Sequence, residues 1–406
     1  MRLPLEIWRE VFTYACSDGG YTGASLALVC KLFYDASHQV RFRCLSFYSL
    51  DEIEAFLEYV QGYEERFQGA RPKVYHLLLS FSQASSDGGS DGELSPGVVS
   101  QNDADEWTTA RRLRQHEKAR WDHKFLQLVP ALLDLVAPHL RTLALLQSDG
   151  HPVPAIRNAL PRLRELTLLV GISAVFHGDP ALDPSGRSAA SPADHPPSPH
   201  RDLFDTTPAT PSSPRFPALE RLHLVCGRLR DFRLHDALAD VPRHAPALTH
   251  LRISNATYTH AQCIPAFLCA ALGVPEPEFE CVAGTAAARF VRIPPAPMML
   301  VGPPGSVVGD DWAAGVKAGL PKLRQAVVHS VLPLPGARCG NPYLEYTALM
   351  DAVDAIGAAC DKAVGVGVHS IRSERQKHRH WEALVERQWM ERVEDGRGCW
   401  VGRGPS

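Results

Sequence analysis

The 406-residue sequence predicts an α/β protein built in three parts. Residues 1–48 carry the apolar periodicity of short helices, residues 49–340 repeat a short pattern that is typical of strands, and residues 341–406 return to helical periodicity. At this length, and with 45% apolar residues, the chain can bury a large core and has room for two or three domains. We therefore expect an N-terminal helical module, a central irregular solenoid of helix–strand units and a C-terminal helical cap.

The first helix is predicted to begin at Pro4, because proline is tolerated in a first turn, where its missing N–H would be unbonded anyway. Glu6 follows, and an acidic side chain near this end is favourable to the helix dipole. Two apolar stripes then run side by side at steps of three and four residues: Ile7, Val11 and Tyr14 in one, and Trp8, Phe12 and Ala15 in the other. Apolar surface this wide predicts packing partners on two sides of the helix.

Two further helices are expected in the N-terminal module. Gly19 and Gly20 interrupt the first pattern, residues 24–33 resume it, and residues 34–42 predict a third helix. Three helices in about 45 residues are near the lower size limit for independent stability. Part of the apolar surface is therefore expected to bind another protein.

This module resembles an F-box, the helical module through which substrate receptors dock onto cullin-type ubiquitin ligases. The likeness rests on Leu-Pro-Leu-Glu-Ile-Trp-Arg-Glu-Val-Phe at residues 3–12 and on Val-Cys-Lys-Leu-Phe at residues 29–33, where the family usually ends in Trp. In that family the matching positions contact a Skp-type adaptor, which implies an adaptor-binding set of Leu3, Pro4, Ile7, Phe12, Val29, Cys30 and Phe33. The alternative is that these residues are ordinary core positions of a helical cap.

The central part contains a repeat that reads apolar-Pro-x-Leu-x-x-apolar-x-apolar. It occurs at residues 137–145, 160–168, 216–224, 245–253 and 320–328, and once without the proline at residues 74–79. The proline closes the preceding segment, because it disfavours a helical conformation in the residue before it. The last two apolar positions, such as Leu166 and Leu168, fall on one face of a strand, with Thr167 on the other. Each copy therefore predicts a short strand.

Helices are expected between these strands, because one unit cannot bury its own apolar face, whereas stacked units share a continuous core. Before the first proline-containing copy, apolar residues keep helical steps: Phe125, Leu128, Val129, Leu132, Leu133 and Val136. Pro130 is expected to kink or restart that helix.

The spacing of the copies is similar to that of leucine-rich repeats. We take the first of the two apolar strand positions as the marker residue of each copy. Neighbouring markers are 23 residues apart from Leu143 to Leu166 and 29 apart from Leu222 to Leu251, and the signature Leu-x-x-Leu-x-Leu is that of the family. Gaps of 66, 56 and 75 residues must hold degenerate units or insertions. The resemblance implies an irregular solenoid in which the asparagine ladder of the family is mostly absent, with Cys226 and Asn255 nearest to it. An ordinary α/β domain with similar strand starts is the alternative.

Two segments are predicted to be disordered insertions. Residues 82–106 carry six acids and no Lys or Arg, a composition that buries too little apolar area to offset the entropy of ordering. Residues 172–215 hold nine prolines. Five Ser-Pro or Thr-Pro pairs there make a candidate platform for proline-directed phosphorylation, at Ser191, Ser198, Thr207, Thr210 and Ser213. The alternative is an insertion enriched in Pro and Ser by drift.

The C-terminal part predicts two helices. Their apolar stripes are Leu349, Val353, Ile356 and Cys360, and then Trp381, Leu384, Val385, Trp389 and Val393. The closing segment Gly398-Cys399-Trp400 resembles the ending of fungal F-box-like proteins. A terminal helix that places Trp389 and Trp400 against the last strand would seal the open end of a solenoid.

Composition and motifs argue against several other functions. The net charge of -3 and the interleaved charges of residues 371–403 argue against a nucleic-acid binder. The apolar stretches are too short to span a bilayer and no signal peptide is evident, so we expect no membrane contact and an intracellular location. The ten cysteines form no Cys-x-x-Cys pair, and no Walker loop, nucleophile elbow or dinucleotide fingerprint occurs. We expect no metal, no cofactor and no enzymatic activity; a Ser/His/Asp hydrolase is unsupported by any motif.

The resemblance implies a substrate receptor of a Skp/cullin/F-box ubiquitin ligase, in which the N-terminal helices hold the adaptor and the repeat surface holds a client protein. Other subunits would transfer ubiquitin, so this chain would contribute proximity between the client and the conjugating enzyme. The alternative is an interaction scaffold outside any ligase, whose N-terminal helices only cap the repeats.

Overall fold

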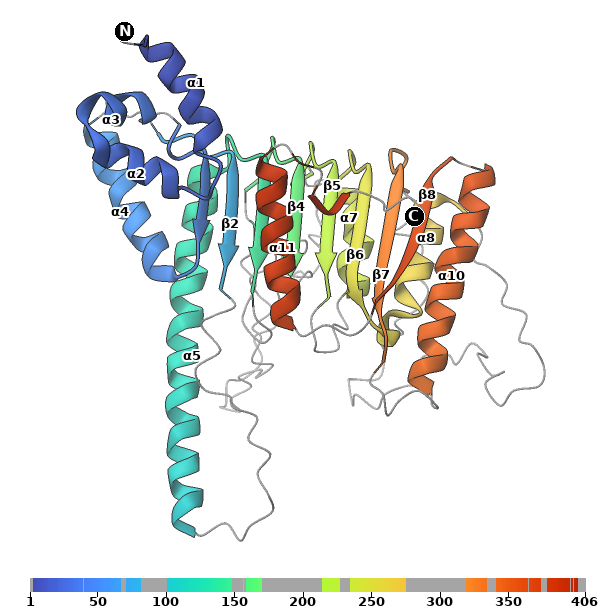
Figure 1. The fold of residues 1–406 in the computed structure, drawn as a ribbon. Helices are drawn as coiled ribbons and strands as arrows, with labels where there is room; N and C mark the ends of the chain where they lie inside the picture. The colour runs from blue at the N-terminus through green and yellow to red at the C-terminus, as the bar shows by residue number, and fades with distance from the viewer. Residues whose placement is uncertain are drawn as a thin grey trace, which may run out of the picture.

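The computed structural model describes residues 3–38, 40–66, 71–81, 101–147, 156, 158–169, 214–226, 234–274, 319–333, 341–363, 365–373, 378–394, 396 and 398–400. Within these residues, eight parallel strands form one sheet and helices lie on both of its faces, so the chain is a mixed α/β protein. The strands lie side by side in chain order, from β1 to β8 (Figure 1).

The strands of the sheet are short. Their bounds are β1 Cys44–Phe47, β2 His76–Ser80, β3 Thr142–Leu146, β4 Glu165–Leu169, β5 Arg221–Val225, β6 His250–Ala256, β7 Gln325–Val331 and β8 Gly367–Ser373. The helices are α1 Leu5–Ala15, α2 Tyr21–Val29, α3 Lys31–Ser37, α4 Leu50–Arg66, α5 Gln101–Val136, α7 Leu234–His244, α8 Cys263–Leu272, α10 Asn341–Ala363 and α11 His378–Val393. Two 3₁₀ turns, η2 Tyr258–His260 and η5 Gly398–Trp400, complete the described elements.

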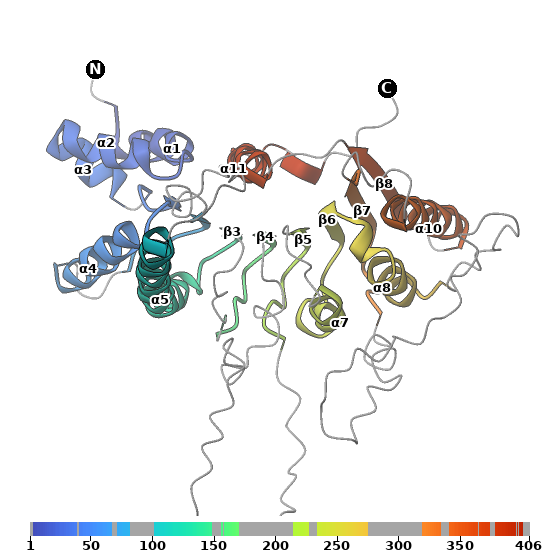
Figure 2. The same ribbon diagram turned by 90° about the horizontal axis from the view of Figure 1, so that it is seen from below.

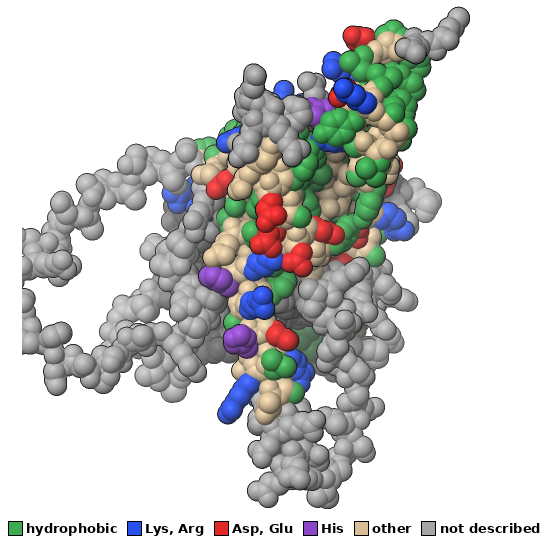
Figure 3. Space-filling model, turned by 90° about the vertical axis from the view of Figure 1, so that its left-hand side faces the viewer, with side chains coloured by type: hydrophobic (Ala, Val, Ile, Leu, Met, Phe, Trp, Pro, Cys, Tyr) green, Lys and Arg blue, Asp and Glu red, His purple; other side chains and the backbone are tan. Residues whose placement is uncertain are grey.

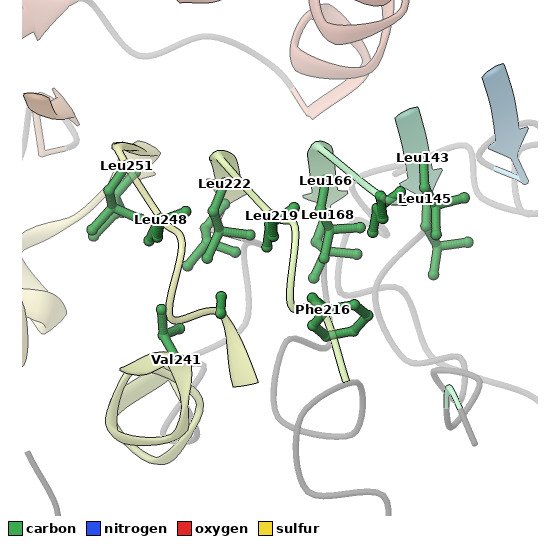
Figure 4. Packing of buried hydrophobic residues seen from close by; sticks show 14 of the residues in the cluster. Leu143, Leu145, Leu166, Leu168, Phe216, Leu219, Leu222, Val241, Leu248 and Leu251 are labelled. Carbon is green, nitrogen blue, oxygen red and sulfur yellow. The ribbon is translucent and has the colours of Figure 1, made fainter. Parts of the chain in front are cut away.

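The strands predicted from the six repeat copies are confirmed as β2 to β7. Their first marker residues lie opposite one another in successive strands: Leu77, Leu143, Leu166, Leu222, Leu251 and Ala326. This common register follows from the Leu-x-Leu spacing, because a shift by one residue would turn both leucines away from the core. Figure 4 shows the labelled leucines of β3 to β6 on the same side of the sheet, above Val241 of α7.

The sheet has two strands that the repeat did not predict. Leu45 in β1 lies opposite Leu77, and Val368 in β8 lies opposite Ala326, so both strands continue the register. Neither strand follows a Pro-x-Leu turn, and β8 begins at Gly367, which weakens its apolar signal. The prediction that residues 1–48 form one helical module therefore missed the strand at residues 44–47.

One face of the sheet carries the main core. Five helices cover it, namely α4, α5, α7, α8 and α10 (Figure 2). The Leu-x-Leu side chains pack there against residues such as Ile53 of α4, Phe125 of α5 and Leu349 of α10. One continuous apolar cluster results, so the helices between strands play the part that the repeat predicted for them.

The opposite face carries a second, smaller cluster that α11 covers (Figures 1 and 2). Trp381, Val385 and Trp389 of α11 pack on alternate strand residues: Cys44, Leu78, Ala144, Leu146, Leu169, Val225 and Val331. This position corrects the prediction that the terminal helix seals the open end of the array. The strands offer apolar side chains on both faces, so the second face needs a cover as much as the end does.

Several helix predictions also need correction. The second helix ends at Val29, since Cys30 is extended with φ -167° and ψ 167°, and the third runs over Lys31–Ser37 and stops before residue 42. α5 runs through Pro130 without a break, held by the buried Val129 and Leu132 on either side of it. Residues 101–106, predicted as part of a disordered loop, begin this helix. Acidic residues are favourable near a helix N-terminus, so a composition rich in acids does not exclude a helix there.

The two predicted insertions lie largely outside the described residues. This holds for residues 82–100 of the first and for residues 172–213 of the second, with all five Ser-Pro or Thr-Pro sites: Ser191, Ser198, Thr207, Thr210 and Ser213. Arg215 is described, and its carbonyl accepts the N–H of Leu160 at 2.8 Å, so the second predicted insertion extends slightly too far.

Candidate protein-interaction site on the N-terminal helices

The N-terminal helices are joined by a small aromatic core. Trp8 and Phe12 of α1 pack against Phe33 of α3, with ring centroids 4.8 and 5.1 Å from that of Phe33. Cys16 and Ala36 are buried beside them. The stripe of α1 that contains Trp8 and Phe12 therefore packs on α3, as an amphipathic helix requires.

The neighbouring stripe of α1 is left uncovered by the residues that the structure describes. Ile7 is 43% exposed, Val11 47% and Tyr14 72%, and Leu3 precedes them at the same helical spacing and is also exposed. Figure 3 shows hydrophobic side chains gathered over the N-terminal helices, at the upper right of that view. The two-sided apolar helix predicted from the sequence thus has an intramolecular partner on one side.

A second exposed apolar group lies where α2 meets α3. The extended backbone of Cys30 separates the two helices and leaves Leu28 88% exposed. Val29 and Leu32, on either side of Cys30, are also exposed. Residues at such a break cannot all face one core, because the chain changes direction between them.

The seven predicted adaptor-binding residues differ in their exposure. Leu3, Pro4, Ile7, Val29 and Cys30 are exposed, and Phe33 is half-buried. Phe12 is only 3% exposed, so this residue departs from the prediction and holds the module together instead of offering a contact. The predicted set left out four exposed apolar residues of the α1 stripe and of the junction between α2 and α3: Val11, Tyr14, Leu28 and Leu32. We call the exposed set Leu3, Ile7, Val11, Tyr14, Leu28, Val29 and Leu32 the apolar N-terminal surface.

The N-terminal helices are attached to β1 by several short contacts. The Ser46 N–H donates to the Gly19 carbonyl at 3.0 Å, and the Cys44 thiol donates to the Ser17 carbonyl at 3.3 Å. Burial raises the pKa of Cys44 to about 12, so its sulfur stays a protonated donor at neutral pH. These bonds hold the exposed surface in a defined position beside the edge of the sheet.

A buried Cys–His pair lies on the second face of the sheet. Cys399 Sγ lies 3.7 Å from His223 Nδ1, and His223 Nε2 lies 2.9 Å from Ser254 Oγ. Both Cys399 and His223 are buried, and burial raises the pKa of Cys399 to about 12 and lowers that of His223 well below its ordinary value. A nucleophilic thiol needs a low pKa and access to substrate, so this pair is structural.

The same cluster anchors the C-terminal turn to the sheet. Arg252 donates to the Cys399 carbonyl at 2.6 Å, and the Glu165 carboxylate accepts from Trp400 Nε1 and Arg392 Nε, each at 2.9 Å. The rings of Trp400 and His223 are T-shaped at 6.3 Å. Trp400 thus contacts the middle strands of the sheet and not its last strand.

No protein-family model, curated protein or solved structure matches this chain. Among the described residues, no three His, Cys, Asp or Glu side chains gather in a way that could hold a metal ion. None of the helices described here combines the length and apolar character that crossing a membrane requires.

Proposed function

We propose that this protein is a substrate-recruiting receptor of a Skp/cullin/F-box ubiquitin ligase. In this proposal the apolar N-terminal surface binds the Skp-type adaptor, the adaptor connects the chain to a cullin, and the sheet-bearing part holds a client protein. The observation that carries the proposal is the uncovered stripe of Ile7, Val11 and Tyr14 beside the buried stripe of Trp8 and Phe12. Exposed apolar residues that form a contiguous patch mark interaction sites.

We also propose that the sheet is a degenerate leucine-rich-repeat-like solenoid. Parallel strands in chain order with Leu-x-Leu in one register support this reading. One rung of an asparagine ladder supports it further: Asn255, with a positive φ of 58°, donates from its side-chain nitrogen to the Cys226 carbonyl at 2.5 Å. The three-part division at residues 48 and 340, and the intracellular location that a ligase subunit requires, stay predictions.

The size of the exposed surface fits a moderate affinity. Ile7, Val11, Leu28 and Val29 are 43, 47, 88 and 62% exposed, so burying what is left exposed of them contributes roughly 4 to 7 kcal/mol, at about 1.5 to 3 kcal/mol for a fully exposed side chain. The loss of translational and rotational freedom on association costs about 4 to 15 kcal/mol. Because these quantities are similar, removing two of the side chains should abolish binding.

The test is capture of the adaptor by the full chain. We expect the double substitution Ile7→Asp and Val11→Asp to lower the recovery of Skp-type adaptor and cullin more than about 100-fold, because two apolar contacts are lost and two charges would have to be buried without a partner. Affinity purification with quantitative mass spectrometry measures the recovery. Phe12 is left unchanged, because its replacement would disrupt the aromatic core of the module.

The matched control carries the same chemical change elsewhere. Leu113→Asp and Leu126→Asp place two aspartates at exposed leucines of α5 and should leave adaptor recovery unchanged. Equal losses in both variants would contradict the proposal. If the unaltered chain captures no adaptor, a scaffold outside any ligase, with N-terminal helices that only cap the sheet, takes its place.

A further inference from the structure

The turns that lead into the strands place two residues of every repeat at one edge of the sheet, the upper edge in Figure 1. In the pattern Pro-x-Leu-y, the leucine is buried and both x and y precede the strand. The y residues adjoin one another through a backbone ladder. The Arg141 N–H donates to the Tyr75 carbonyl at 2.7 Å, that of Arg164 to the Arg141 carbonyl at 2.8 Å, and that of Arg324 to the Thr249 carbonyl at 2.8 Å.

Half of the twelve x and y positions are basic, and Arg43 precedes β1 at the same edge. The set consists of Arg43, Lys73, Arg141, Arg162, Arg164, Lys322 and Arg324, which we call the basic rim. Glu220 is the one exposed carboxylate at the x and y positions of the described turns. The whole sequence has more acidic than basic residues, 45 against 42, so the rim is more basic than the chain as a whole.

The described residues supply no anionic partner for most of the rim. The ion pairs formed within them do not include Arg141, Arg162, Arg164, Lys322 or Arg324. Arg43 and Arg141 instead flank the ring of Tyr75, with guanidinium carbons 5.6 and 4.9 Å from its centroid. Both distances lie within the range of cation–π contacts.

A hollow interrupts the rim at β5 and β6. It is lined by Glu220, Ala247, Thr249, His250, Lys322 and Arg324. The pKa of His250 lies below its ordinary value because of burial and, after that, because of the cations Arg221 and Arg324. Lys322 and Arg324 bring two cations to the lining of the hollow, and Glu220 brings its one carboxylate.

We propose that the basic rim binds an acidic, extended polypeptide segment of a partner protein, lying across the beginnings of the strands. The rim spans the starts of β1 to β7, six intervals of about 4.8 Å, which an extended peptide of about nine residues matches. Glu220 disfavours a continuous polyanion such as a nucleic acid, whereas a peptide can place a neutral or basic residue there. That the partner is the client protein rests on the proposed function. That the basic rim binds an acidic segment does not depend on it.

The test uses two fluorescent peptides of about ten residues and the full chain. One peptide alternates Glu with Ser, and the other has Gln in place of every Glu. We expect fluorescence anisotropy to show binding of the Glu peptide and no binding of the Gln peptide. The affinity for the Glu peptide should fall about tenfold or more between roughly 50 and 200 mM salt, because salt screens exposed charges. Equal binding of the two peptides would overturn the proposal.

Charge-reversal variants locate the site. Arg141→Glu with Arg164→Glu should weaken binding of the Glu peptide at least about tenfold, because two attractive charges become repulsive. The matched control, Arg112→Glu with Arg114→Glu on the exposed face of α5, changes the net charge by the same amount and should alter affinity less than about twofold. If the first pair fails to fold, Lys322→Glu with Arg324→Glu tests the other end of the rim. Equal effects in rim and control variants count against the site.

Two further outcomes separate this inference from the alternatives. The first uses a single-stranded oligonucleotide of equal charge. If it binds more tightly than the Glu peptide and loses affinity in the rim variants, the partner of the rim is a nucleic acid and not a peptide. The adaptor-surface variant Ile7→Asp with Val11→Asp should keep full peptide binding, and the rim variants should keep adaptor capture. Failure of one proposal is therefore distinguishable from failure of the other.

Discussion

His260 shows how a single buried ring can couple stability to pH. It ends the 3₁₀ turn η2, and its Nδ1 accepts the N–H of Thr257 at 3.1 Å, which closes a capping box with the Thr257 side chain. The ring is buried, and burial lowers its pKa from 6.5 to about 4. The neutral ring is thus the form that fits, because a protonated Nδ1 could not accept this hydrogen bond.

The pH dependence follows from the direction of that shift. The unfolded chain binds a proton at this histidine near pH 6.5 and the folded chain near pH 4, so its contribution to stability is present above pH 6.5 and is lost as the pH falls toward 4. We expect His260→Gln to reduce the slope of the unfolding free energy against pH in this window by up to about 1.4 kcal/mol per pH unit. Urea denaturation at several pH values measures it.

A second substitution in the same cap serves as the control. Thr257→Val removes the hydroxyl of the capping box but keeps the backbone N–H that His260 accepts. It should lower stability by about 1 kcal/mol at every pH and leave the slope unchanged. If the unfolding free energy of the His260→Gln variant changes with pH in parallel to that of the unaltered chain, the neutral buried ring is not the source of the pH dependence.

Helix α2 depends on a glycine for its position. A Cβ built on Gly23 would lie 2.8 Å from the Cβ and 2.9 Å from the Cα of Arg41, closer than real side chains approach. The residues after α3 therefore cross α2 at backbone distance, and this crossing connects the N-terminal helices to β1. No sequence pattern signals it, because a glycine inside a helix is ordinarily a cost and not a contact.

Two glycine-to-alanine substitutions test this crossing against helix propensity. Gly23→Ala should destabilise the protein by about 1 to 3 kcal/mol, because the Arg41 backbone must move. Gly62→Ala in α4, where a Cβ would meet nothing within 4 Å, should stabilise it by about 0.5 to 1 kcal/mol. Chemical denaturation measures both. A stabilising effect of both substitutions would mean that α2 does not contact the chain at residue 41.

Helix α11 illustrates a different limit of sequence reasoning. Its apolar stripe was correctly predicted as helical and buried, with Trp381 and Trp389 on the inner face. Its location was not, because an apolar stripe does not identify the surface that it covers. The alternate residues of the strands, such as Leu78 and Leu169, provided the missing signal, since they are apolar where a single-sided sheet would have polar residues.

The molecule has cores of very different size. The main cluster joins five helices to every strand of the sheet, whereas the N-terminal helices rest on Phe12, Cys16 and Ala36 and the side chains packed around them. A core this small contributes little stability of its own. We therefore expect the N-terminal helices to open at a lower free energy than the sheet, as a separate cooperative unit.

Hydrogen exchange with single core truncations tests this separation. Phe12→Ala, which removes about 3 to 5 kcal/mol of packing, should abolish protection in α1 to α3 and leave β3 to β6 protected. Leu222→Ala, at the centre of the sheet, is the matched truncation and should weaken protection in β4 to β6. Loss of protection throughout the chain in the Phe12→Ala variant would show that the two cores unfold together.

The sequence by itself determined the periodic features of this protein. Six strands with two alternate apolar residues each, the start of α1 and the two apolar stripes of that helix follow from local rules, since proline fixes the turn and residue spacing fixes the face. Only the tertiary structure decided which stripe of α1 is buried, that α11 covers the sheet, and that basic residues of separate turns form one rim. These depend on contacts between segments far apart in the chain, and spacing within a segment carries no information about its partner.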